Sequence, residues 1–228
     1  MLVSDPTPDR PAPDRPAPDR PTPEDLLASH GTTYAEQAGI TLRDKPMPLF
    51  QLLVLTQLSS IRISADTAAA AAHELFRAGW RTPERLRGST WQERVDALGR
   101  GGYRRYDEST ADYLDELAAR VQDAHRGDLR RIRPRDSDSG ADADDPVAAL
   151  RDELTDFPRI GPTGADIFCR EVQAVWPEVR PHFDDRAREA AGQLGYPTSA
   201  RALADLVADE DVARFSAALV RWSLDGSG

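Results

Sequence analysis

Signals for the start of a helix recur along this chain, while no segment alternates polar and apolar residues over the length of a β-strand. Thr22–Pro23 and Thr82–Pro83 each place a capping side chain before a proline suited to a first helical turn. Residues 50–61 are apolar on nearly all sides, which predicts a central, buried helix. The sequence therefore predicts an all-α fold.

Two further helix boundaries rest on the same kinds of signal. We expect the helix that starts at Pro23 to continue to about Gly39. Ser109 and Asp112 have the spacing of a capping box, which predicts that another helix begins at Ser109.

A proline-rich repeat precedes these helices. Residues 5–22 read DPTPDRPAPDRPAPDRPT, in which the unit PDRP returns every five residues. Prolines at this density lack backbone donors and block both helix and sheet pairing. We therefore expect a solvated, disordered tail over residues 1–22 and a helical domain over residues 23–228.

The charge balance narrows the possible partners. The chain has 29 basic and 39 acidic side chains, a net charge of −10 and a pI of about 4.9. Taken whole, this balance argues against non-specific binding to nucleic acid. However, residues 136–145 contain five aspartates and no basic residue, so half of the net charge lies in one segment.

Two residue types occur only once. The single cysteine, Cys169, excludes an intrachain disulfide, a multi-cysteine zinc site and an iron–sulfur cluster held by several cysteines. The single lysine, Lys45, leaves one side-chain candidate for amine chemistry. We expect no metal and no cofactor.

No apolar run approaches the roughly 20 residues of a membrane span, and no secretory signal is visible, so we expect a soluble, cytoplasmic protein.

A helical hairpin is predicted over residues 154–165. One helix ends near Leu154, Phe157–Pro158 makes a tight turn, and a second helix begins at Pro162. The amides of such a helix N-terminus point outward and can bind a phosphate without a basic side chain. An ordinary hairpin of two helices with a glycine in its turn has the same pattern.

Four segments together resemble one family. Residues 157–165 read FPRIGPTGA and are similar to the hairpin L-P-G-[VI]-G-x-[KQ]-T-A of the helix-hairpin-helix DNA glycosylase superfamily, endonuclease III-like group. Residues 183–195 resemble the aspartate segment of that family, residues 49–55 its first barrel helix, and residues 102–111, loosely, its G-[LFY]-Y region. The resemblance implies a two-lobed helix-hairpin-helix DNA glycosylase fold with a DNA cleft between the lobes.

The departures from the family pattern bear on the chemistry. Thr163 occupies the position of the hairpin lysine that forms an imine in bifunctional members, so the lyase route has no evident nucleophile. The family's catalytic aspartate aligns with Asp184. A carboxylate there can stabilise an oxocarbenium-like transition state and accept a proton from water. Alternatively, Asp184 or Asp185 simply caps the helix that follows.

The resemblance also implies a DNA-contacting surface. The first hairpin glycine is replaced by Arg159, whose guanidinium can lie beside a phosphate. Ile61 and Arg62 stand where some members insert a side chain into the duplex. Tyr103 and Tyr106 are the aromatic residues that we favour for stacking on an extruded base. The expected DNA-binding residues are Arg159, Ile160, Gly161, Thr163, Gly164 and Arg62.

The sequence thus predicts a monofunctional DNA glycosylase of base excision repair. We expect it to act as a nucleoid-associated monomer on double-stranded DNA with a flipped base, with Asp184 as the catalytic residue. Two alternatives stay open: a catalytically degenerate helix-hairpin-helix protein that binds DNA without cutting it, and an interaction protein that has lost DNA binding.

Overall fold

The computed structural model describes residues 20–134 and 146–226, and all regular elements in these ranges are helical. The α-helices are α1 (Pro23–His30), α2 (Tyr34–Gln37), α3 (Pro46–Ser59), α4 (Ala65–Arg77), α5 (Pro83–Arg87), α6 (Trp91–Arg100), α7 (Asp107–His125), α8 (Pro146–Thr155), α9 (Pro162–Val172), α10 (Asp185–Gln193), α11 (Ala200–Ala204) and α12 (Val212–Asp225). Short 3₁₀ helices are η1 (Leu129–Ile132), η3 (Pro177–Val179) and η4 (Asp209–Asp211). The all-α prediction is confirmed. Most of the expected tail and the acidic segment 136–145 lie outside the described residues.

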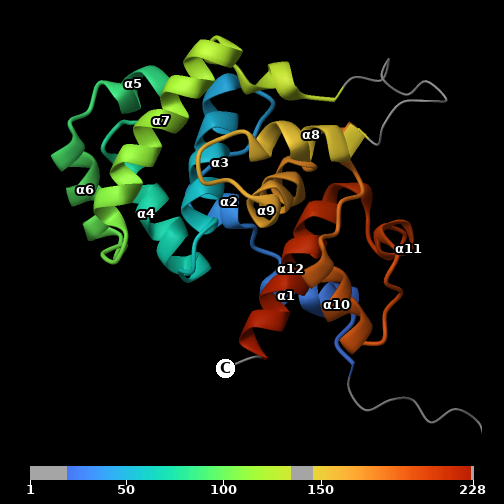
Figure 1. Cartoon of the computed structure of the whole chain (residues 1–228). Helices are drawn as coiled ribbons and strands as arrows, with labels where there is room; N and C mark the ends of the chain where they lie inside the picture. The colour runs from blue at the N-terminus through green and yellow to red at the C-terminus, as the bar shows by residue number, and fades with distance from the viewer. Residues whose placement is uncertain (1–19, 135–145, 227–228) are drawn as a thin grey trace, which may run out of the picture.

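The helices form two groups joined by a central pair (Figure 1). On one side, α4 packs on α6, and α5 and α6 both pack on α7. On the other side, α12 packs against α1 and α10. Between them, α3 packs against both α4 and α9, so the two groups meet along the α3–α9 contact. In the ranges that the structure describes, no helix has the length and apolar composition that a bilayer crossing requires.

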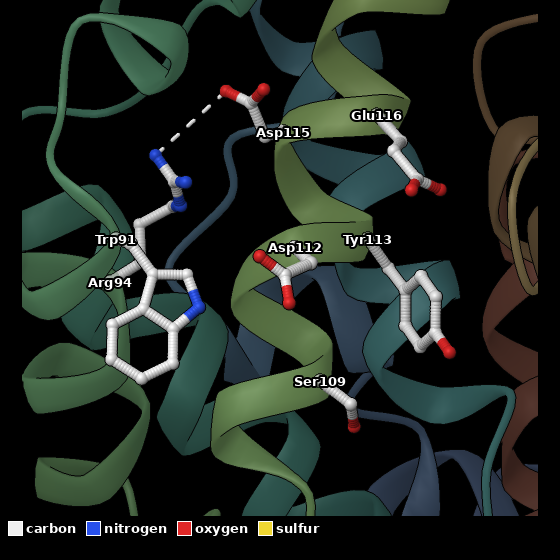
Figure 2. A pocket seen from close by; sticks show the side chains of 7 residues that line it. All are labelled: Trp91, Arg94, Ser109, Asp112, Tyr113, Asp115 and Glu116. Atoms are coloured by element: carbon white, nitrogen blue, oxygen red, sulfur yellow. Dashed lines mark ion pairs between the residues drawn. The ribbon is translucent and has the colours of Figure 1, made fainter.

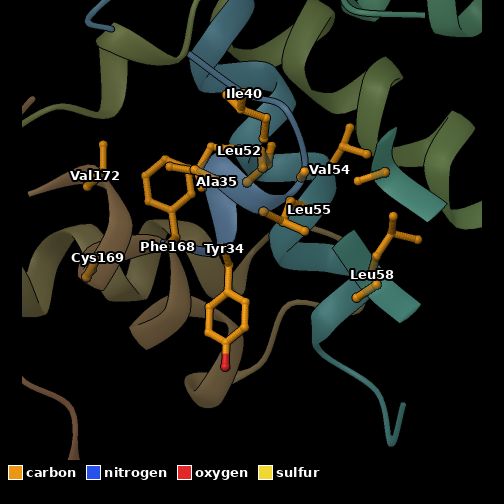
Figure 3. Close-up of a cluster of buried hydrophobic side chains, with 14 of the residues drawn as sticks. Tyr34, Ala35, Ile40, Leu52, Val54, Leu55, Leu58, Phe168, Cys169 and Val172 are labelled. Carbon is orange, nitrogen blue, oxygen red and sulfur yellow. The ribbon is translucent and has the colours of Figure 1, made fainter. Parts of the chain in front are cut away.

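Helix α3 is the centre of the hydrophobic core, as its apolar sequence predicted. Every residue from Pro48 to Leu58 is buried. One side of α3 meets the buried face of α9, where Leu52 lies near Phe168 (Figure 3). The Tyr34 ring lies at the edge of this cluster and its hydroxyl points away from it. The α3–α9 contact therefore fixes where the start of α9 lies.

Two predicted helix boundaries are wrong. The helix from Pro23 ends at His30 rather than near Gly39. A second capping box starts α2 instead, because Thr33 accepts from the Glu36 amide and the Glu36 carboxylate accepts from the Thr33 amide.

The predicted capping box at Ser109 is also absent. Helix α7 begins two residues earlier, at Asp107. The Ser109 hydroxyl donates to the Tyr106 carbonyl at 3.2 Å, so it does not cap an amide. A hydroxyl inside the first turn of a helix can bind a backbone carbonyl behind it, and the sequence spacing alone does not exclude this.

Candidate functional site

The hairpin consists of α8, a turn over residues 156–161, and α9. Phe157 is buried and anchors the turn, while Arg159 adopts a left-handed φ of +61° within it. Gly161 is the N-cap of α9, and no side chain caps the amides there. The exposed start of α9 therefore presents uncapped amides at the positive end of the helix dipole.

Close packing holds the start of α9 against the end of α3. A Cβ added at Gly164 would overlap the Ser60 hydroxyl and come within 3.1 Å of the Ile160 side chain. This close contact is what requires a glycine at position 164. Its backbone conformation does not, because Gly164 lies within the helix. By contrast, a Cβ at Gly161 would meet no atom within 4 Å. The hairpin is thus fixed on its inner side and open on its outer side.

Asp184 is the N-cap of α10. Its Oδ1 accepts from the Ala187 amide at 2.9 Å, and its Oδ2 accepts from Nη1 of Arg170 at 2.5 Å. The Asp184 side chain is 9% exposed and that of Arg170 4% exposed. The carboxylate is therefore fixed from two directions. Because a carboxylate offers about four lone-pair sites, two donors leave acceptor capacity for a water molecule.

Arg170 and the neighbouring Glu171 form a buried charged group with Asp184. Burial alone would lower the pKa of Arg170, but the carboxylates of Asp184 and Glu171 raise it. Burial raises the pKa of Glu171, against the opposing effects of Arg170 and of the Ala35 and Tyr34 amides that donate to its carboxylate. Glu171 thereby also attaches the start of α2 to α9. The guanidinium of Arg170 is the positive centre that both carboxylates share.

Asp184 and Thr163 line the same cavity, which has a volume of about 770 Å³. Its walls come from α1, the start of α2, the end of α3, and α4, α9, α10 and α12. Five aspartates and three arginines line it, together with His30 and the Tyr34 ring. The hairpin and the aspartate that follows it in sequence thus face one common space, and the structure resolves the choice between the two N-cap candidates in favour of Asp184.

Helices near both ends of the part of the chain that the structure describes contribute to the rim of this cavity. His30, at the end of α1, lies 3.2 Å from the Asp225 carboxylate at the end of α12. Arg221, one turn earlier on α12, lies 4.3 Å from the centre of the Tyr34 ring. The rim therefore depends on the packing of α1 against α12.

The residues that line the cavity include no lysine. Lys45 is exposed at the N-cap of α3 and does not contribute to the cavity. His182 lies 3.4 Å from Asp166, but no group of three or more metal-ligating side chains occurs within residues 20–134 and 146–226.

The other expected DNA-binding residues differ in accessibility. Arg62 and Arg159 are exposed. The Ile160 side chain is buried, so only the backbone at this position remains available for a contact. Tyr103 is wholly buried and its hydroxyl donates to the Leu58 carbonyl at 3.0 Å, so the expectation that it stacks on an extruded base is wrong. Tyr106 is half-buried and lines a different, smaller pocket rather than the Asp184 cavity.

A further pocket, of about 450 Å³, lies between α6 and α7 (Figure 2). Trp91, 39% exposed, stands beside it, and Asp112, Asp115 and Glu116 line it from α7. Arg94 approaches Asp115 at 3.8 Å. No residue of the hairpin contributes to this pocket, so it is not part of the candidate site.

Sequence reasoning missed Arg170. It lies seven residues after Thr163, which places both side chains on the same face of α9 two turns apart. That spacing was visible in the sequence. What it could not reveal is that the Asp184 carboxylate would lie against that face.

Comparison with known proteins finds no matching protein-family model and no matching curated protein. The chain is similar to endonuclease III in a trapped covalent intermediate with DNA, an estranged-adenine complex, with 18% identity and a TM-score of 0.46. It is also similar to a non-covalent endonuclease III–DNA complex, with 17% identity and a TM-score of 0.47. Each alignment covers 88% of this chain and 85% of the other.

Proposed function

We propose that this chain is a monofunctional DNA glycosylase of base excision repair that acts as a nucleoid-associated monomer on double-stranded DNA. The single observation that carries the proposal is that Asp184 and the hairpin residue Thr163 line one cavity. The exposed amides at the start of α9 would bind a phosphate of the strand. The Asp184 carboxylate would then face the sugar of a nucleotide extruded into the cavity.

In the proposed reaction, the C1′–N bond breaks and the base departs with its electron pair. The oxygen of a water molecule bonds to C1′, and its proton passes to the Asp184 carboxylate. The same carboxylate stabilises the positive charge that develops on the sugar. Arg170 and the Ala187 amide hold the carboxylate in place. No lysine lines the cavity, so hydrolysis by water fits better than imine formation.

An assay for base release tests this function. The protein is incubated with duplexes that each contain one damaged or mismatched base, and abasic sites are then cleaved by alkali. We expect release from at least one lesion, and we expect Asp184→Asn to lower the rate about 10²–10⁴-fold. Strand breaks in the absence of alkali would contradict the monofunctional assignment.

Asp185 supplies the matched control. It lines the same cavity, but its side chain is 86% exposed and pairs with Arg188 in the adjacent turn. Asp185→Asn removes the same charge from the same cavity without touching Arg170. Equal losses in the two variants would show that the net charge of the cavity matters and that Asp184 has no special role.

A DNA-binding protein without catalysis is the second candidate. One observation favours it: both Asp184 oxygens already have a protein partner, which is what a purely structural carboxylate would show. This candidate predicts salt-dependent retention on duplex DNA and no base release from any lesion. Absence of retention even at low salt would leave only an interaction protein.

A further inference from the structure

Three tyrosines of the chain are buried, and their hydroxyls differ in one respect. Tyr103 donates to the Leu58 carbonyl at 3.0 Å, and Tyr196 donates to the Pro21 carbonyl at 2.5 Å. Tyr34 is 6% exposed, as is Tyr196, yet its hydroxyl has no hydrogen-bond partner among the described residues. A buried tyrosine hydroxyl usually has such a partner. Tyr34 therefore keeps a polar group that the folded chain itself does not use.

The unpaired hydroxyl faces the Asp184 cavity. Tyr34 lines that cavity, and Figure 3 shows its hydroxyl pointing away from the hydrophobic cluster around α3. The start of α2 is held against α9, because the Glu171 carboxylate accepts from the Ala35 amide at 2.9 Å and from the Tyr34 amide at 3.4 Å. The ring is therefore fixed in place, and its hydroxyl is accessible to a group that enters the cavity.

Two guanidinium groups lie beside the Tyr34 ring. The Cζ atom of Arg221 lies 4.3 Å from the ring centre, and that of Arg170 lies 5.4 Å from it. Arg170 also binds the Asp184 carboxylate at 2.5 Å, so one side chain contacts both the tyrosine and the candidate catalytic residue. Positive charges next to the hydroxyl favour the approach of an acceptor atom over the approach of another N–H donor.

The protonation state of Tyr34 also suits a donor. Burial raises the pKa of the Tyr34 hydroxyl above its ordinary value, although the charges of Arg170 and Arg221 act in the opposite direction. The hydroxyl therefore keeps its proton at neutral pH. Among the groups that a nucleobase presents, a carbonyl oxygen accepts a hydrogen bond, whereas an exocyclic amine donates one. A carbonyl oxygen is thus the base atom that fits this hydroxyl.

We propose that the Tyr34 hydroxyl donates a hydrogen bond to a carbonyl oxygen of the extruded base, so that the cavity prefers a base with a carbonyl there over one with an amine. This inference rests on the proposed function, because that function brings an extruded base into the Asp184 cavity. It makes Tyr34 a residue that selects the substrate. A site that pairs a buried polar group with its substrate discriminates strongly against an analogue that leaves this group unpaired.

Binding to duplex DNA tests the preference. Four duplexes each carry one 2′-fluoroarabino nucleotide, which slows cleavage of the C1′–N bond, with hypoxanthine, adenine, uracil or cytosine as its base. Each base lies opposite a stable abasic analogue, so that no base pair has to be broken. Hypoxanthine and uracil carry a carbonyl where adenine and cytosine carry an amine. We expect the wild type to bind at least one carbonyl duplex about 3- to 10-fold more tightly than its amine counterpart, as one net hydrogen bond predicts.

Two variants remove the same atom from tyrosines of equal exposure. In Tyr34→Phe, we expect the preference to disappear and the Tm to stay unchanged, because no hydrogen bond among the described residues is lost. Tyr196→Phe is the matched control, because Tyr196 does not line the cavity and its hydroxyl binds the Pro21 carbonyl. This control should keep the preference and lower the Tm. A purely structural role of the Tyr34 hydroxyl predicts a lower Tm of Tyr34→Phe with the preference unchanged.

Loss of the preference in Tyr34→Phe alone supports the proposal. A preference that survives in Tyr34→Phe, an equal loss in both variants, or equal binding of all four duplexes by the wild type would overturn it and leave the glycosylase function standing. Preferential binding without base release in the lesion assay would overturn the glycosylase function and retain the Tyr34 contact in a protein that only binds DNA. Failure to bind any of the duplexes would overturn the inference, and absence of base release as well would overturn both.

Discussion

The ion pair between Arg170 and Asp184 allows a quantitative test of the site. We consider Arg170→Met, which keeps an unbranched chain of similar length but removes the charge. In the wild type, Arg170 lies 2.5 Å from Asp184 and 3.9 Å from Glu171, and all three side chains are at most 9% exposed. The variant would leave two buried carboxylates without their cation.

The expected cost follows from this burial. Removing one partner of a buried ion pair lowers the free energy of unfolding by about 3–5 kcal/mol. For a domain of this size, that corresponds to a fall in Tm of about 10 °C. Asp184→Asn should lower the free energy of unfolding less than Arg170→Met does, because the asparagine oxygen can still cap α10. The double variant Arg170→Met with Asp184→Asn should be more stable than the sum of the two losses predicts, by at least about 1 kcal/mol.

Urea denaturation followed by far-UV circular dichroism measures the free energy of unfolding of the wild type, the two single variants and the double variant. If the two losses add within about 0.5 kcal/mol, Arg170 and Asp184 do not interact as described. The idea that Arg170 positions the carboxylate would then be wrong, whatever the base-release assay shows.

Three further predictions concern the hairpin and the buried acid. Thr163→Lys puts an amine into the cavity that contains Asp184, so borohydride should trap a covalent adduct with abasic DNA; a variant that binds DNA without an adduct would count against a shared reaction space. Gly164→Ala should lower the free energy of unfolding by about 1–3 kcal/mol through overpacking. Gly161→Ala, whose Cβ enters open space, should lower it clearly less. Equal Tm values of the two variants would refute the close approach between Gly164 and Ser60. The raised pKa of Glu171 means that the wild type loses stability relative to Glu171→Gln as pH rises from about 4.5 towards the folded-state pKa; parallel pH profiles of unfolding would contradict this.

Local signals in the sequence identified many of the helices and the hairpin. Thr22–Pro23 and Thr82–Pro83 start α1 and α5, since a cap and a first-turn proline act within a few residues. The same local logic failed at Ser109, whose hydroxyl donates to the Tyr106 carbonyl instead of accepting from an amide in the first turn. Patterns of this kind are decisive only where one local arrangement is clearly favoured.

The composition of the site was less accessible to sequence reasoning. Asp184 was singled out by its motif, but its partner Arg170 lies 14 residues away and meets it in a fold in which α12 packs against both α9 and α10. Tyr103, expected at a DNA surface beside Arg104, is instead part of the core. Whether an aromatic residue is buried depends on the packing of distant helices, which local sequence does not encode.

The pairing of His30 with Asp225 has a practical consequence for experiments on this protein. These residues come from the first and the last helix that the structure describes, and together they line one edge of the cavity. An affinity tag fused after Gly228 would begin at the fourth position after Asp225. Substrate entry measured on such a fusion would report partly on the tag, and a cleavable N-terminal tag placed before the proline repeat is the safer choice.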